Sequence, residues 1–174
     1  MKKTILFLLL ACIYVNSALA QVLKYDSEAE LMGAAATSPS STGEILVRLV
    51  GKCGTYDDSL RTSGDQVLRS WQERHHAYLD ENRRVRTQLE AMYTTPEARN
   101  KFEDMMEKQV PALVDKQYQV YAAMIDATSD RSGKVQLCNS YFQAISAQKF
   151  DLKVNDPTLA AYLDKRIRGR SKTK

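Results

Sequence analysis

The sequence has few of the residues from which catalytic and cofactor sites are usually built. Its 174 residues include three cysteines, two histidines and seven glycines. It contains no Gly-x-Ser-x-Gly nucleophile motif, no glycine-rich phosphate-binding loop and no Cys-x-x-Cys-His haem-attachment motif. These absences argue against hydrolase, nucleotide-binding and cytochrome functions. The sequence therefore predicts a protein that is not an enzyme and holds no cofactor.

The only long apolar run lies at the N-terminus, where it has the form of a secretory signal peptide. A cationic start precedes an apolar stretch over residues 5–15, and small residues end at Ala20. The stretch is shorter than the roughly 20 residues that span a bilayer. We expect residues 1–20 to be removed near Ala20 and the mature chain to be periplasmic or secreted. Nucleic acid is then not an expected partner.

A less favoured alternative treats Leu9-Leu10-Ala11-Cys12 as a lipoprotein processing site. Cys12 would then be lipidated and would tether the chain to a membrane. That interpretation leaves an unusually short apolar run before the site. It also places an apolar stretch, residues 13–15, where a polar tether is expected.

Removal of the signal would leave two cysteines, Cys53 and Cys138. Two thiols in one small domain usually form a bridge in an oxidising compartment. In the chain-entropy model, closing a loop of that length stabilises the fold by about 4 to 5 kcal/mol. We therefore predict a disulfide between these two residues.

Composition divides the remaining chain into three parts. Residues 21–41 are rich in small residues and include Ser38-Pro39-Ser40-Ser41, which predicts a flexible lead-in. Residues 42–168 show helical periodicity and predict one helical bundle domain. Residues 169–174 have no periodicity and predict a disordered basic tail.

The strongest helical pattern follows Ser63-Gly64-Asp65 and extends to about Tyr93. Its inward residues recur in steps of three and four, which is typical of a helix that packs along a partner. A shorter helix is expected before it, from about Thr42 to Gly54. After it, Thr94-Thr95-Pro96 predicts a new helix across a tight turn, so that two long helices form a hairpin. The predicted seam is Leu68, Trp71, His75, Tyr78, Asn82, Val85, Leu89 and Met92.

The helix after the turn is expected to kink or break at Pro111 and to end near Thr128. A fourth helix then places Cys138 inward, and Asn155-Asp156-Pro157 begins a short fifth helix. If the first four helices alternate in direction, the end of the first and the start of the fourth meet, as the disulfide requires. The predicted fold is all-α: a single-domain up-and-down helical bundle with a long central helical hairpin and one disulfide.

The two histidines, His75 and His76, are adjacent and would point about 100° apart on a helix. With Asp80 they are weak candidate metal ligands, and we predict no metal site. His75 and Asn82 are better interpreted as polar seam residues, each hydrogen-bonded to a side chain across the interface. They could face the core or another subunit.

Methionine and aromatic residues flank the predicted hairpin turn. Such surface is adaptable and recurs at protein-binding grooves. If the turn extends beyond the shorter helices, these residues form a candidate partner-binding set; otherwise they pack against each other. The set is Met92, Tyr93, Phe102, Met105 and Met106.

The last ten residues carry six Lys or Arg and no acid. A basic residue near an anionic surface contributes about 1 kcal/mol to binding, so the segment is a candidate for peripheral contact with the envelope. Alternatively it is a solvated chain end. The candidate residues are Arg166, Arg168, Arg170, Lys172 and Lys174.

Together these patterns predict an exported, non-enzymatic interaction protein of the bacterial periplasm. Its expected partner is a protein, which it would bind in a chaperone-like, inhibitor or immunity role. The alternative is a structural or surface-associated envelope protein, which would hold membrane or cell-wall polymer through the basic C-terminal segment.

Overall fold

The computed structural model describes residues 24–171, and that range is helical without a strand. The predicted signal peptide and the last three residues lie outside it. The all-α fold class is confirmed. The elements are α1 (Glu28–Gly54), α2 (Asp58–Met92), α3 (Pro96–Asp104), the π-helix η1 (Met105–Gln109), α4 (Val110–Ala127), α5 (Arg131–Ser146), α6 (Leu152–Asn155) and α7 (Pro157–Ser171).

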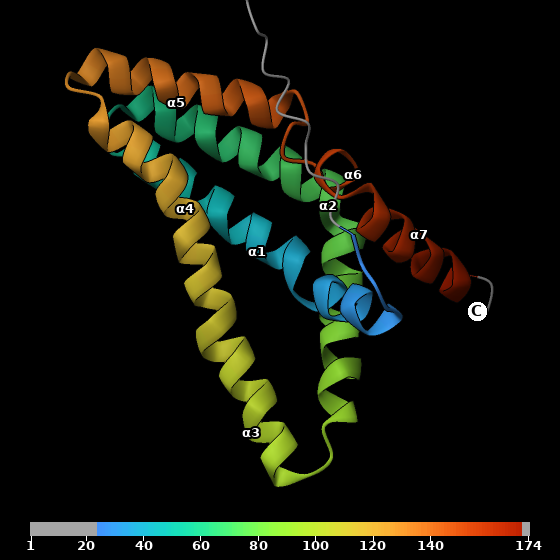
Figure 1. Cartoon of the computed structure of the whole chain (residues 1–174). Coiled ribbons are helices and arrows are strands. Elements are labelled where there is room, and N and C mark those ends of the chain that lie inside the picture. The colour runs from blue at the N-terminus through green and yellow to red at the C-terminus, as the bar shows by residue number, and fades with distance from the viewer. Residues whose placement is uncertain (1–23, 172–174) are drawn as a thin grey trace, which may run out of the picture.

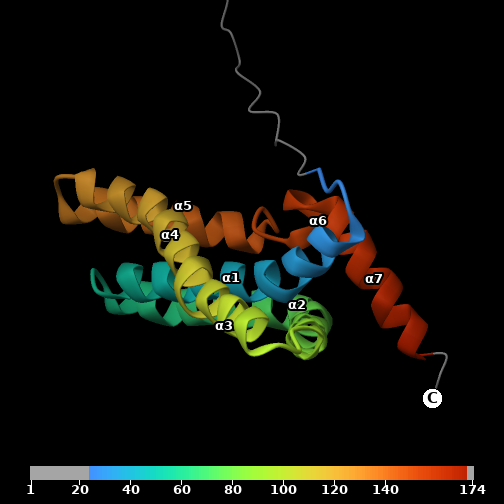
Figure 2. The same ribbon diagram turned by 60° about the horizontal axis from the view of Figure 1, so that its bottom comes forward.

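Four of these helices form an up-and-down bundle at one end of the molecule (Figure 1). Helix α1 packs against α2 and α4, and α5 packs against α2 and α4. The α1–α2 and α4–α5 contacts join helices that run in opposite directions, whereas α1 and α4 run in the same direction, and so do α2 and α5 (Figure 1). Figure 2 shows α1 and α2 in one layer with α4 and α5 over it. At the other end, α7 packs on α6, α1 and α2.

The predicted disulfide joins the last turn of α1 to the first half of α5. The Cα atoms of Cys53 and Cys138 are 5.6 Å apart, and both residues are fully buried. The prediction that these two helix ends lie at the same end of the bundle is confirmed. The disulfide links α1 in one helical layer to α5 in the other.

The apolar core has two centres, one in the bundle and one beside α7. The bundle centre includes Leu46, Leu49, Val50, Leu60, Trp71, Ile125, Phe142 and Ile145 around the disulfide. The second includes Ala35, Ala36, Tyr78, Val85, Leu152, Leu159, Ala160 and Leu163. Helices α1 and α2 contribute to both centres, so the two helices connect the molecule from end to end.

Helix α1 is much longer than predicted, because it begins at Glu28 and not near Thr42. The predicted flexible lead-in is therefore wrong for residues 28–41. The Ser27 hydroxyl accepts a hydrogen bond from the N–H of Glu30, and the Glu30 carboxylate accepts one from Asp26. This reciprocal cap starts the helix, and the small side chains that follow allow close packing on α2 and α7.

Pro39 lies inside α1 because another residue replaces its missing N–H. Proline cannot donate to the carbonyl of Ala35, four residues earlier. The Asn82 side chain of α2 donates to that carbonyl instead, with Nδ2 2.8 Å from the oxygen. Asn82 and Ala35 are both buried, so the Asn82 side chain faces the core of its own chain and not another subunit. Helix α1 continues past the proline to Gly54, and its first part runs in a different direction from the rest (Figure 1).

Helix α2 also begins earlier than predicted, at Asp58, with the Asp57 carboxylate accepting from the N–H of Ser59. Gly64 is consequently inside the helix and not before it. A Cβ at Gly64 would lie 2.7 Å from Val50 and 2.9 Å from Phe142. Glycine is needed here because α1 and α5 approach the α2 backbone closely.

The hairpin of α2 and α3 is splayed, which the sequence did not predict. The seam of α2 exists as predicted at Trp71, His75, Tyr78, Asn82 and Val85, all of them buried. However, its main partner is α1 and not the helix across the turn. The elongated α1 occupies the face of α2 that a tight hairpin would have used. Beyond the turn, α3 and η1 project away from the bundle (Figure 1).

Pro111 interrupts the second arm of the hairpin as predicted, and the interruption takes the form of a π-helix. Over Met105–Gln109, before the proline, the backbone hydrogen bonds span five residues instead of four. An example is the bond from the N–H of Val110 to the carbonyl of Met105. This wider turn accommodates the carbonyl that a proline would otherwise crowd.

Candidate interaction surfaces

The five residues predicted to bind a partner at the hairpin turn do not share one environment. Met92 is 63% exposed, whereas Phe102 and Met106 are buried. The rings of Tyr93 and Phe102 meet across the turn, with centroids 5.0 Å apart. Tyr93, Phe102 and Met105 line a shallow hollow with polar neighbours. The set is thus mainly a small local cluster, and Met92 contributes its clearest exposed apolar surface.

A more extensive apolar surface lies on the outward face of α4. Leu113, Val120 and Met124 are 65%, 60% and 54% exposed. Their spacing of seven and four residues places them on one stripe of the helix, together with Gln117 between them. The exposed alanines beside the stripe, Ala112, Ala123 and Ala127, add no charge. We call Leu113, Gln117, Val120, Met124 and Ala127 the α4 face.

Both acidic residues of α4 lie on its side towards α1, while the exposed Lys116 stands at the edge of the α4 face. The Asp115 carboxylate accepts from Arg48 of α1 at 2.6 Å, and Asp126 accepts from Lys52 at 2.7 Å. The bond from Arg48 lowers the pKa of Asp115. The Arg48 guanidinium also lies over the Tyr118 ring, 4.1 Å from its centroid. The acidic groups of α4 are therefore turned towards α1, and apolar groups are left facing outward.

The basic C-terminal segment is helical as far as Ser171, so the predicted disordered tail is wrong for residues 169–171. Arg166 donates to the buried carboxylate of Glu81 at 2.9 Å, and Arg170 lies 2.6 Å from the same carboxylate. Burial opposes the charge of Arg166, but the bond to Glu81 raises its pKa.

Among the three of the five basic candidates that the structure describes, only Arg168 has an exposed side chain. Arg166 and Arg170 hold α7 to α2 through Glu81, which sequence reasoning missed. Lys172 and Lys174 lie outside the described residues. The sequence feature that could have indicated a buried Glu81 is its position one residue before Asn82, on the border of the predicted seam.

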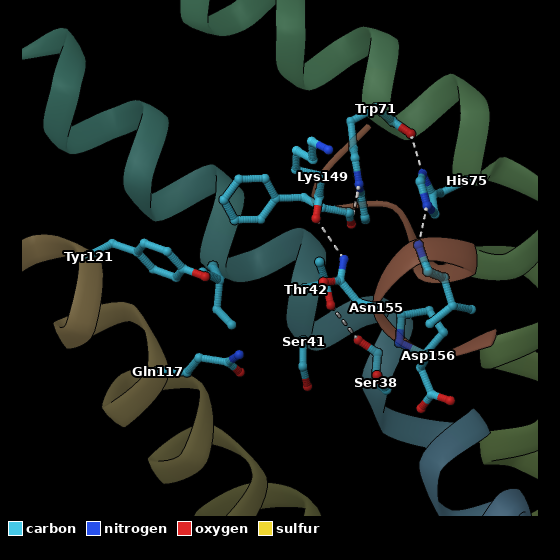
Figure 3. Close-up of a pocket in the computed structure, with 14 residues that line it drawn as sticks. Ser38, Ser41, Thr42, Trp71, His75, Gln117, Tyr121, Lys149, Asn155 and Asp156 are labelled. Carbon is cyan, nitrogen blue, oxygen red and sulfur yellow. Dashed lines mark hydrogen bonds between the residues drawn. The ribbon is translucent and has the colours of Figure 1, made fainter. Parts of the chain in front are cut away.

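The histidines lie in different environments. His75 is buried and uses both ring nitrogens: Nδ1 donates to the Trp71 carbonyl at 2.9 Å, and Nε2 accepts from the N–H of Leu152 at 3.2 Å (Figure 3). Its seam position is as predicted, but the predicted side-chain partner is wrong for His75 and for Asn82, because both bond backbone groups. His76 is exposed and lies 3.5 Å from Asp80. In residues 24–171, no three His, Cys, Asp or Glu side chains are grouped to hold a metal ion.

No protein-family model, curated protein or solved structure matches this chain. Within the described range, each helix is too short or too polar to cross a membrane.

Proposed function

We propose that this chain is an exported, non-enzymatic interaction protein of the bacterial periplasm, which binds a helical segment of a partner protein on the α4 face. The observation that carries the proposal is the exposed apolar stripe of Leu113, Val120 and Met124. Exposed apolar side chains gathered on one helix face are a feature of protein interaction sites.

The spacing of the α4 face favours a helix as the partner. Residues 113, 117, 120, 124 and 127 alternate in steps of four and three, which is the seam of two helices packed side by side. Covering the three large side chains would contribute about 3 to 5 kcal/mol before the entropic cost of association. Neighbouring surface, including the projecting α3 and η1, would have to supply the rest of the affinity.

The compartment in this proposal depends on two features of different kinds. One is the predicted signal peptide over residues 1–20. The other is the Cys53–Cys138 disulfide, which is typical of proteins that mature in an oxidising environment. Chaperone-like, inhibitor and immunity roles all use a preformed surface of this type, and none requires a catalytic group.

The experiment compares two triple variants in affinity capture from the native envelope. The first replaces Leu113, Val120 and Met124 with glutamine, which keeps helix propensity and size while removing apolar surface. The control replaces three outward polar residues of α5 with alanine: Gln136, Ser140 and Gln143.

We expect the wild-type protein and the α5 variant to retain the same specific partner and the α4 variant to lose it. Equal recovery by both variants would refute binding at the α4 face. Recovery of only a second copy of this chain would contradict the proposed role and would indicate a homodimer.

A further inference from the structure

A cavity of about 360 Å³ lies where α1 bends, between α1, α4 and the segment that joins α5 to α6 (Figure 3). Trp71 and His75 of α2 form part of its wall, and Gln117 and Tyr121 of α4 line the opposite side. The volume is at the lower end of the range for small-molecule sites. The cavity is separate from the exposed apolar stripe of the α4 face, although Gln117 borders both.

Several lining groups are held in place by hydrogen bonds within the protein. The Trp71 indole donates to the Phe150 carbonyl at 3.2 Å, and the Thr42 hydroxyl donates to the Ser38 carbonyl at 3.1 Å. Asn155 donates to the Lys149 carbonyl at 2.8 Å. Figure 3 shows these bonds around the cavity. The walls are therefore positioned before any ligand binds, which lowers the entropic cost of binding.

Three other lining groups have hydrogen-bonding capacity to offer a ligand. The Ser41 hydroxyl, the Gln117 amide and the Tyr121 hydroxyl make no hydrogen bond to another residue in the described range. Figure 3 shows Ser41 and Gln117 on facing sides of the cavity. All three groups can donate and accept. Burial raises the pKa of Tyr121, which keeps its hydroxyl protonated.

The charged groups of the lining do not point into this polar region. The Asp156 carboxylate accepts from the N–H of Leu159 at 2.9 Å and from the Tyr25 hydroxyl. In Figure 3 the Lys149 ammonium is directed away from Ser41 and Gln117. A charged ligand would thus lose hydration without gaining a counter-charge, so the cavity favours a neutral ligand.

We propose that this cavity binds a neutral saccharide of one or two rings. A sugar offers hydroxyls at its edges, which match the three uncommitted polar groups. Its C–H faces suit aromatic walls, here the partly buried rings of Tyr121 and Phe150. The site does not rest on the partner proposed for the α4 face, although Gln117 belongs to both surfaces. Sugar titration of the isolated protein tests the cavity in the absence of that partner.

The chain has a single tryptophan, so Trp71 emission reports directly on the cavity wall. The full mature protein is titrated with glucose, N-acetylglucosamine and their β-1,4-linked dimers, and calorimetry provides a second readout. Glucosamine and glucuronate serve as cationic and anionic counterparts. We expect saturable binding of at least one neutral sugar and weaker binding of its charged counterparts.

Gln117→Leu and Ser41→Ala each remove hydrogen-bonding capacity and should weaken binding by about tenfold. The matched controls are Gln136→Leu and Ser140→Ala on the outward face of α5, which should leave the affinity unchanged. Circular dichroism and thermal unfolding verify that every variant is folded. Absence of saturation with all neutral sugars, stronger binding of a charged sugar, or equal affinity in lining and control variants would overturn the proposal.

Discussion

The bond between Asn82 and Ala35 provides the sharpest stability test of the fold. Asn82→Ala removes the donor that replaces the N–H missing at Pro39 and leaves a buried carbonyl unpaired. An unsatisfied buried backbone group costs about 1 to 3 kcal/mol, and the lost side-chain packing adds to that. We therefore expect the free energy of unfolding to fall by about 2 to 4 kcal/mol.

A second substitution separates the hydrogen bond from the packing. Pro39→Ala restores an N–H that can donate to the Ala35 carbonyl, so Asn82→Ala should cost less in that background. The expected coupling is at least about 1 kcal/mol. Urea unfolding of the disulfide-bonded protein measures the wild type, the two single variants and the double variant, which together form a double-mutant cycle. Asn100→Ala, on the exposed surface of α3, is the control and should be nearly neutral.

An additive cycle would refute this reasoning, because Asn82 would then stabilise the fold without regard to the proline. A loss below about 0.5 kcal/mol for Asn82→Ala would refute it as well, since that is the range of ordinary surface substitutions. Either result would require another explanation for a helix that continues through Pro39.

Three further predictions concern glycine packing, the disulfide and alkaline pH. Gly64→Ala should destabilise the protein by about 1 to 2 kcal/mol in urea unfolding despite its gain in helix propensity, because the added Cβ has no space. Gly51→Ala, where a Cβ meets open space, should stabilise the protein by up to about 1 kcal/mol. Equal effects of the two substitutions would contradict the close approach of Val50 and Phe142 to Gly64. Reduction of Cys53–Cys138 should lower the free energy of unfolding by about 3 to 5 kcal/mol, and a reduced protein of unchanged stability would contradict this. Burial and a hydrogen bond to Asp164 raise the pKa of Tyr78 in the folded state, so the contribution of Tyr78 to the free energy of unfolding should be lost as pH rises above its pKa of about 10 in the unfolded chain. Tyr78→Phe should flatten that part of the plot of stability against pH. An unchanged slope would argue against the hydrogen bond to Asp164.

The parts of the fold that the sequence predicted are those with a local or chemical signal. The α2 seam recurs in steps of three and four, and Pro111 has a known effect on the turn before it. The pairing of Cys53 with Cys138 followed from export and from helices that alternate in direction. Each of these inferences needs only a few residues and no knowledge of distant contacts.

The early start of α1 was missed because composition was given more weight than capping. Ser27 and Glu30 have the spacing of a capping box, and this pattern could have located the start of the helix. The continuation through Pro39 depends on Asn82, which is far away in sequence. Tertiary contacts of this type override local propensity, and they are invisible in the pattern of residues 28–41.

The candidate sites were predicted less well than the fold, because exposure depends on which helices become neighbours. Leu113, Val114, Met124 and Ile125 all stand at helical spacing in the sequence, and that pattern does not separate the exposed Leu113 and Met124 from the buried Val114 and Ile125. That separation follows from the position of α1 against α4. The cavity is lined by Ser38, Pro39 and Ser41 of α1, so a flexible lead-in over residues 21–41 left no basis for predicting it.

The most direct test of the proposed function is a photo-crosslinking scan along α4 in intact cells. A photoreactive amino acid is placed singly at positions 113, 116, 120 and 124 of α4 and at positions 136, 140 and 143 of α5. The account predicts crosslinks to one and the same partner protein at 113, 120 and 124, weaker crosslinking at 116 and none from α5. Uniform crosslinking at all positions, or no crosslink from α4, would contradict a partner bound on the α4 face.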